Sequence, residues 1–117
     1  MAQFVPATSH RVAALIAPGL EEVEALAVVD LLYRAGVRTD MIAVGPQVQV
    51  VSSHGITLTC DHVLDQVDLA DYDLLFLPGG IPGTPNLDAC EPLMAEVEAR
   101  VRAGRPVAAI CAAPSIL

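Results

Sequence analysis

The sequence predicts an α/β protein built on an open, mostly parallel sheet. Three short runs, at residues 11–19, 72–80 and 106–111, are mainly apolar and are typical of strands that helices cover on both faces. Two longer segments, at 20–36 and 91–104, place apolar residues at helical spacing. Strand and helix therefore alternate along the chain, which is the pattern of a parallel sheet. Ligands bind such sheets outside the carboxyl ends of the strands.

The remaining segments fit this pattern. Residues 1–10 form an N-terminal extension before the first predicted strand. The helix predicted over 20–36 has acidic residues in its first turn and Arg34 in its last, and a glycine suited to end it follows. A further strand is predicted over 38–45. Residues 47–61 alternate in hydropathy around a turn-like Ser-Ser-His-Gly, which indicates a small hairpin.

Composition and charge narrow the class of partner. With 117 residues, 54% of them hydrophobic, the chain is at most one domain and has enough apolar residues to form a core. Fourteen acidic residues face six arginines and no lysine, and the net charge of −8 argues against nucleic acids and anionic membranes as partners. The lack of lysine also excludes Schiff-base catalysis within this chain.

Cysteine usage and the N-terminus predict a cytoplasmic protein. Three cysteines, an odd number at wide spacing, fit a reducing compartment better than a set of disulfides. The first residues do not combine a basic start with an apolar run, so we expect no signal peptide. No segment is long and apolar enough to predict a membrane span.

Cys111 is the first candidate functional residue. It ends the last predicted strand, and the small residues of AICAA (109–113) around it match a nucleophile elbow, a sharp turn that larger side chains would block. Pro114 suits the first turn of a helix, which would place Cys111 at a helix N-terminus, where thiolate is favoured over thiol. A structural cysteine in a strand of small residues explains the same letters equally well.

The LPGG segment (77–80) is the second candidate. Gly79 and Gly80 follow a predicted buried strand and can present backbone N–H groups to a ligand without a Cβ in the way. Beside the elbow, these groups and the N–H of Ala112 would form an oxyanion hole. A plain turn that needs positive φ is the alternative, and for this segment alone the better one. The glycine patterns of nucleotide-binding loops are absent from the chain.

Glu24 is the third candidate. It falls on a predicted buried stripe of the 20–36 helix, whereas Glu21 and Glu22 flank the stripe and are predicted to be solvated; the stripe consists of Leu20, Val23, Ala27, Val28 and Leu31. A carboxylate there is costly unless it is hydrogen-bonded, protonated or able to reach water at a rim. Its place after the first strand makes it the natural companion of Cys111. Apolar residues elsewhere on this helix predict a homodimer that packs partly through it, or cover by further chain.

Three segments together resemble one family. APGLEEVEA (17–25), LPGGIPGTPNL (77–87) and AAICAAP (108–114) are similar, in order and spacing, to the ThiJ/PfpI superfamily, the family of the parkinsonism-associated protein deglycase, and most of all to its bacterial YajL-like branch. The resemblance implies a flavodoxin-like α/β sandwich, usually a homodimer. It implies that residues 11–117 are the N-terminal portion of a single domain, whose sheet is incomplete at the C-terminus.

The same resemblance implies roles for the candidates. Cys111 matches the family's oxidisable nucleophile and Glu24 the acid that hydrogen-bonds its sulfur; the oxyanion-binding backbone positions match Gly79, Gly80 and Ala112. The implied activity is of the glyoxalase or deglycase type, on methylglyoxal, glyoxal or their adducts with proteins and nucleotides. It would protect against carbonyl and oxidative stress and would need neither cofactor nor metal.

Two alternatives and several departures accompany this interpretation. One alternative is a redox sensor or chaperone without turnover; a lower-ranked one is a class I glutamine amidotransferase or a peptidase-like hydrolase. None of His10, His54 and His62 matches the family's histidine, which lies downstream of the elbow. His54 stands where close relatives carry arginine. Cys60 and Cys90 match no functional motif and are predicted to be structural thiols.

Overall fold

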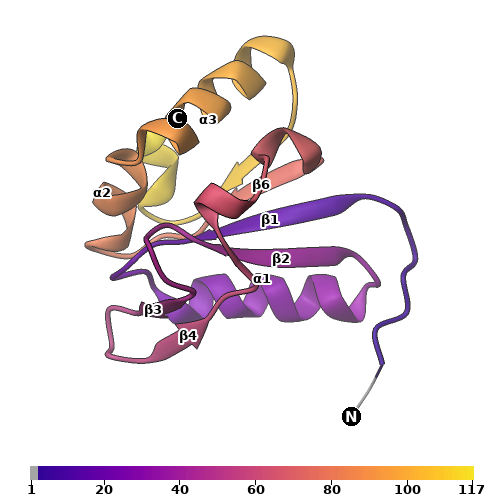
Figure 1. Ribbon diagram of the computed structural model, residues 1–117, viewed down its shortest axis with the longest axis horizontal. Coiled ribbons are helices and arrows are strands. Elements are labelled where there is room, and N and C mark those ends of the chain that lie inside the picture. Colours follow the sequence, from indigo (N-terminus) through magenta and orange to yellow (C-terminus); the bar gives the residue numbers. More distant parts are fainter. Residues whose placement is uncertain (1–2) are drawn as a thin grey trace.

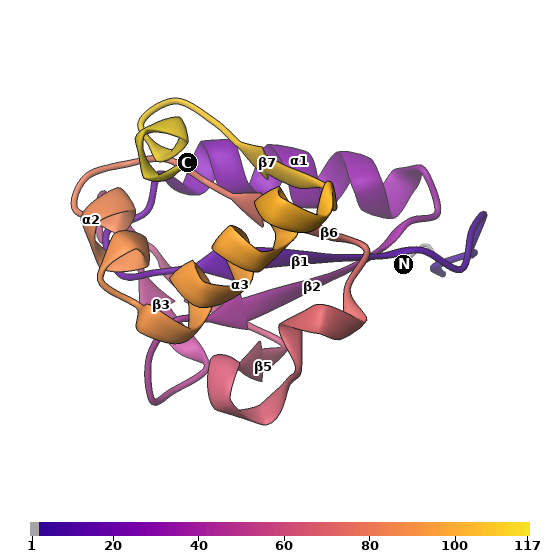
Figure 2. The same cartoon turned by 90° about the horizontal axis from the view of Figure 1, so that it is seen from above.

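The parallel α/β architecture is confirmed in the computed structural model, which describes residues 3–117. Five strands form one parallel sheet in the order β5-β2-β1-β6-β7, with α1 on one face and α2 and α3 on the other (Figure 1; Figure 2). The strands of this sheet are β1 (Arg11–Ile16), β2 (Arg38–Ala43), β5 (His62–Val63), β6 (Leu74–Leu77) and β7 (Val107–Ala109). The α-helices are α1 (Glu22–Arg34), α3 (Glu91–Ala103) and the short α2 (Gly83–Asp88).

The core is divided by the central strand β1. Ala13 through Ile16 are fully buried, because side chains of this strand point alternately into the two faces of a sheet covered on both sides. Leu15 belongs to the cluster that also contains Leu93 and Val97 of α3. Ile16 belongs to the opposite cluster, which is covered by α1. The apolar run that predicted a two-faced strand is therefore confirmed.

The predicted hairpin is also confirmed, outside the main sheet. Strands β3 (Gln49–Val51) and β4 (Thr57–Thr59) pair antiparallel, with Val50 opposite Leu58. The hairpin is held to the beginning of α1 by two backbone hydrogen bonds, from the Gly19 N–H to the Val51 carbonyl (2.9 Å) and from the Ser53 N–H to the Leu20 carbonyl (2.8 Å). These bonds bring the hairpin turn to the helix N-terminus.

Several short helices were not predicted. Helix α2 lies in the Pro/Gly-rich stretch after the LPGG segment, where we predicted no element, and its Pro85 is tolerated because first-turn N–H groups have no helical partner. Three 3₁₀ turns also occur: η1 (Leu64–Gln66), η2 (Leu69–Asp71) and η3 (Ala113–Ile116). Strand β7 is half-buried, not buried as predicted, because it lies at the edge of the sheet.

The predicted buried stripe of α1 is wrong for part of its length: Leu20 is buried and Val28 packs against the core, but the other large apolar residues of the stripe face outward. Val23 and Leu31 are 69% and 65% exposed, and Glu22 and Ala25 are the buried residues of the helix. The cause is Glu22, which turns inward because Ser52 and His54 of the hairpin turn offer it hydrogen-bond partners. With Glu22 inside, the face that carries Val23 and Leu31 is turned to the surface.

The N-terminal extension packs against the end of α1. The Phe4 ring lies 5.2 Å from the Tyr33 ring, between centroids, and the Ala7 N–H donates to the Gly36 carbonyl at 2.9 Å. The first two residues of the predicted extension lie outside the described residues. Within residues 3–117, no helix combines the length and the hydropathy needed to cross a membrane.

Candidate active site

Cys111 occupies a strained elbow just after β7. Its φ is +58°, and it is the only residue other than glycine with positive φ in the described part of the chain. Left-handed backbone is unfavourable for a residue with a Cβ and occurs preferentially at functional sites. The Cys111 side chain is exposed, whereas Ala113, two residues on, is fully buried. The small residues of AICAA thus allow the chain to turn sharply and leave the sulfur accessible.

The LPGG loop lies beside this elbow because β6 and β7 are parallel neighbours, with Leu77 opposite Ala109. A Cβ placed on Gly79 would lie 2.9 Å from the Cys111 Cβ and 2.7 Å from Glu24 Oε1. Gly79 is therefore the point at which the loop, the elbow and α1 meet, and only glycine fits such a contact. Gly80 has a φ of +101°, and its Cβ would collide with the backbone nitrogen of Glu21.

Glu24 reaches this junction from the first turn of α1. Its Oε1 is buried and has no hydrogen-bond partner within residues 3–117. The Glu24 carboxylate, first as hydrogen-bond acceptor and then as negative charge, raises the pKa of the Cys111 thiol. The hydrogen bond from the Ala112 N–H lowers this pKa, but by less than Glu24 raises it. The low thiol pKa expected from a helix N-terminus is thus corrected, since the Glu24 carboxylate that faces the sulfur raises this pKa by more than the Ala112 N–H lowers it.

The predicted site residues are therefore neighbours, although their roles stay predictions. Cys111, Glu24 and Gly79 meet directly, and Gly80 and Ala112 adjoin them in the loop and the elbow. In the described part of the chain, the N–H groups of Gly80 and Ala112 donate to no backbone or side-chain oxygen. They are thus available to a negatively charged oxygen formed at the sulfur.

The other two thiols have different surroundings. Cys60 is buried beneath the hairpin, and burial raises the pKa of its thiol to about 11, so it stays protonated. Cys90 is half-buried and packs against the core on the α3 side. Cys111 is the exposed thiol among the three.

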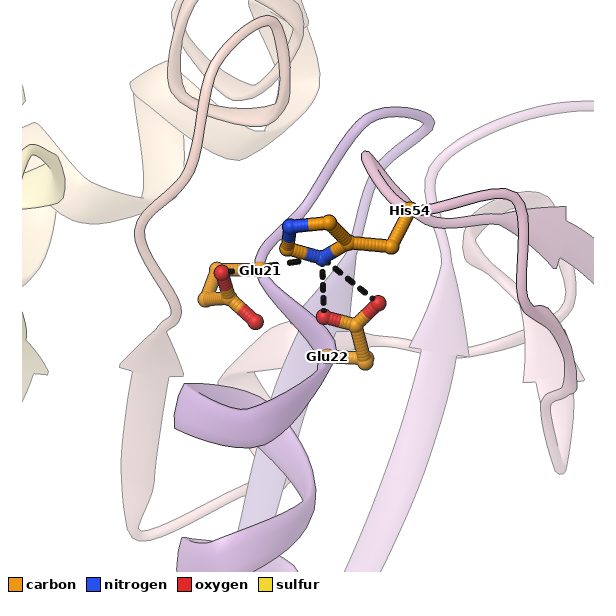
Figure 3. Close-up of side chains that lie close together, drawn as sticks. All are labelled: Glu21, Glu22 and His54. Carbon is orange, nitrogen blue, oxygen red and sulfur yellow. Dashed lines mark hydrogen bonds and ion pairs between the residues drawn. The ribbon is translucent and has the colours of Figure 1, made fainter.

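A second cluster was missed by the sequence interpretation. Glu21, Glu22 and His54 converge where the hairpin turn meets the N-terminus of α1 (Figure 3). His54 Nδ1 lies 2.8 Å from Glu22 Oε2 and 3.8 Å from Glu21 Oε2. Hydrogen bonding to Glu21, and then to His54, lowers the pKa of Glu22 to about 2, while Glu22 raises the pKa of His54. The sequence contains the adjacent acids and the turn histidine, but no local pattern predicts that His54 and Glu22, 32 positions apart, are in contact.

Fold and site together define an α/β protein with a cysteine elbow at the carboxyl end of its sheet. The model of the DJ-1/PfpI family matches residues 10–117, and the chain belongs to this family. The resemblance found in the three sequence motifs is thereby confirmed.

Individual relatives agree with this assignment. Protein DJ-1 homolog B of Arabidopsis thaliana is 36% identical over 102 residues, which are 87% of this chain and 23% of that protein. The solved structure of oxidized DJ-1 from Toxoplasma gondii superposes with a TM-score of 0.88 at 30% identity, and covers 93% of this chain and 59% of that one. A solved C103A mutant of the DJ-1 superfamily protein STM1931 from Salmonella typhimurium superposes with a TM-score of 0.86 at 34% identity. The match covers 92% of this chain and 58% of that one. The chain thus spans little more than half of the solved relatives, and less of the plant protein.

Proposed function

We propose that this protein is a cysteine-dependent enzyme of the glyoxalase or deglycase type that acts on small reactive carbonyls or their adducts. The observation that carries the proposal is the exposed Cys111, held in a left-handed elbow with the Glu24 carboxylate acting on its sulfur. A strained, accessible thiol beside an acid is the arrangement that nucleophilic catalysis requires. We place it in the cytoplasm, in protection against carbonyl and oxidative stress.

The raised pKa of Cys111 supports a proton transfer from the thiol to Glu24. The thiol is protonated at neutral pH, so the Glu24 carboxylate acts as general base and takes the S–H proton while sulfur attacks the carbonyl carbon. A C–S bond forms, and the electron pair of the C=O double bond moves to oxygen. The N–H groups of Gly79, Gly80 and Ala112 stabilise this alkoxide, which becomes the hydroxyl of a hemithioacetal when the proton is returned.

A redox sensor or chaperone without turnover is the second candidate function. The exposure of Cys111 favours it, and the Toxoplasma gondii relative was solved in an oxidized form. Oxidation proceeds through the thiolate, however, and the acid beside Cys111 raises the pKa of the thiol, which disfavours the sensor. Amidotransferase or peptidase-like hydrolase chemistry is the lower-ranked candidate, because no observation on these residues favours it over carbonyl chemistry.

We further propose that the protein is a homodimer formed partly through α1. Val23 and Leu31 lie eight positions apart, on one face of the helix, and are the most exposed apolar side chains on it. A second copy of the same helix is the partner that a self-complementary apolar face requires.

The enzymatic proposal is tested by methylglyoxal consumption and lactate formation. We expect turnover by the wild-type chain and by the Cys60→Ser control. Cys111→Ser should lose at least about 100-fold, because a serine hydroxyl is a much weaker nucleophile than a thiol at neutral pH. Turnover that survives Cys111→Ser would refute the proposal. Stoichiometric oxidation of Cys111 by peroxide without any methylglyoxal turnover would establish the sensor instead.

A further inference from the structure

We propose that Glu21, Glu22 and His54 form a binding site for a first-row divalent transition-metal ion of the Zn²⁺ class. One carboxylate oxygen from each acid and one imidazole nitrogen lie within 4.8 Å of one another (Figure 3). Mixed imidazole and carboxylate donors are a usual ligand set for such ions. Three protein ligands leave a coordination position for water, as in open zinc sites.

The donor spacing already approaches that of a coordinated ion. With metal–ligand distances of about 2.0–2.2 Å, ligand atoms around a tetrahedral ion lie roughly 3.3–3.6 Å apart. The distances from His54 Nδ1 to Glu22 Oε2 and Glu21 Oε2 are 2.8 Å and 3.8 Å. The first distance is shorter than this range and the second slightly longer, so both lie within tenths of an ångström of the spacing around a bound ion.

The hairpin turn fixes the donors in advance. Glu22 is 5% exposed, and the Ser52 hydroxyl donates to its Oε1 at 2.8 Å. The oxygen of the same hydroxyl accepts two backbone hydrogen bonds, from the His54 main-chain N–H at 3.3 Å and from the Ile56 main-chain N–H at 3.1 Å. Ser52 therefore orients the buried carboxylate and the turn that carries the imidazole. Outer-shell contacts of this kind raise metal affinity by holding ligands in place.

Charge at the cluster favours a cation. Two carboxylates face one imidazole, so the three groups carry an excess of negative charge even when His54 is protonated. The shallow depression at this place is lined by Glu21, Glu22, Val23, Glu24, His54 and Ile56, with neither lysine nor arginine among them. The His54 side chain is 62% exposed, which gives an ion and its waters access.

The competing explanation is a plain ion pair in which protonated His54 locks the hairpin to Glu22. The two accounts differ in the Zn²⁺ binding that they predict. A metal site predicts saturable binding of one ion, whereas a plain ion pair predicts none. They also differ from a thiol site, since soft ions prefer the exposed Cys111 sulfur. The matched controls therefore remove a thiol or a remote histidine.

The test is a titration of the whole chain with Zn²⁺, followed by calorimetry, and with Co²⁺, followed by visible absorption. We expect one ion per chain, an affinity weakened by about 10-fold or more in His54→Ala and Glu21→Gln, and a Co²⁺ spectrum without thiolate charge transfer. Cys111→Ser and His62→Ala should bind as the wild type does. Melting curves of the metal-free variants show that each one folds.

Three results would overturn the proposal: no saturable binding by the wild type, equal affinity in folded His54→Ala and Glu21→Gln, or loss of binding in Cys111→Ser. Because metal affinity is the readout, the outcome does not depend on whether the protein consumes methylglyoxal.

Discussion

At the scale of single residues, the chemistry depends on the meeting of Cys111 and Glu24 across Gly79. The elbow makes the sulfur accessible, and the absence of a Cβ on Gly79 lets the acid approach it. The small residues around Cys111 were sufficient to predict the elbow, since a sharp turn beside neighbouring strands excludes larger side chains. They could not predict the sign of the pKa shift, which depends on how near the carboxylate lies.

Replacing Glu24 by Gln should lower the pKa of the Cys111 thiol. The carboxylate raises that pKa as acceptor and as charge, and the isosteric amide removes the charge, so the thiolate fraction at neutral pH should rise. We expect iodoacetamide to label Cys111 several-fold faster at pH 7, with the midpoint of the rate–pH profile moved to lower pH.

The matched control for this substitution is Glu21→Gln. Glu21 acts on Cys111 only through its charge, as the smallest of the causes, so its replacement should move the midpoint less. A labelling profile of Glu24→Gln that coincides with that of the wild type, or lies at higher pH, would show that Glu24 does not control the thiol.

At the scale of elements, one buried cation joins α3 to the sheet. The Arg100 side chain is fully buried, pairs with Glu96 at 3.0 Å, and donates to the carbonyls of Leu69 (2.7 Å), Tyr72 and Asp73 (3.2 Å). These carbonyls belong to the 3₁₀ turn η2 and the residues that lead into β6. Arg100 therefore fixes the connection that sets where β6, and after it the LPGG loop, begins.

Arg100→Met should lower the free energy of unfolding by roughly 1–3 kcal/mol, the cost of losing a charged hydrogen-bond donor to buried acceptors. The loss stays in this range because the Leu69 carbonyl also accepts from the Tyr72 N–H and the Tyr72 carbonyl also accepts from Arg105. Urea denaturation measures the change. Arg102→Met is the control, because within residues 3–117 this exposed arginine pairs with Glu98 alone, and such a substitution changes stability by about 0.5 kcal/mol or less. Equal losses in both variants would show that the buried contacts of Arg100 contribute nothing particular.

The elements also show how far sequence patterns extend. Strand β1 and helices α1 and α3 were predictable because apolar periodicity depends on burial, which the packing confirms. The inward face of α1 was not, because apolarity assigned Val23 to the core and Glu22 to solvent. In the structure Glu22 is buried and Val23 is exposed, because Ser52 and His54 form hydrogen bonds to Glu22. Both belong to the hairpin turn, and Ser52 lies 30 residues from Glu22 in the chain.

At the scale of the whole molecule, one exposed face of α1 is apolar. The sequence already contained its residues, but the same letters predicted a buried stripe, and only the packing of Glu22 shows which side is free. If the protein is a homodimer through this face, Leu31→Asp should shift it toward monomer by placing a charge in the interface. Sedimentation velocity over a range of concentrations measures the shift.

Val101→Asp is the matched control for Leu31→Asp, because Val101 is similarly exposed, at 61%, but lies on α3, on the opposite side of the sheet. It should leave the oligomeric state unchanged. A wild-type chain that is monomeric at all concentrations, or an effect of Val101→Asp equal to that of Leu31→Asp, would exclude a dimer through α1.

The most direct test of the central claim, that Cys111 is the nucleophile toward carbonyls, is site-resolved protection of the thiols. Methylglyoxal is added before a short pulse of iodoacetamide, and labelling of Cys111 and Cys90 is quantified by mass spectrometry. We predict that methylglyoxal slows labelling of Cys111 saturably and leaves that of half-buried Cys90 unchanged. Unprotected Cys111, or equal protection of both thiols, would contradict the assignment of Cys111 as the nucleophile.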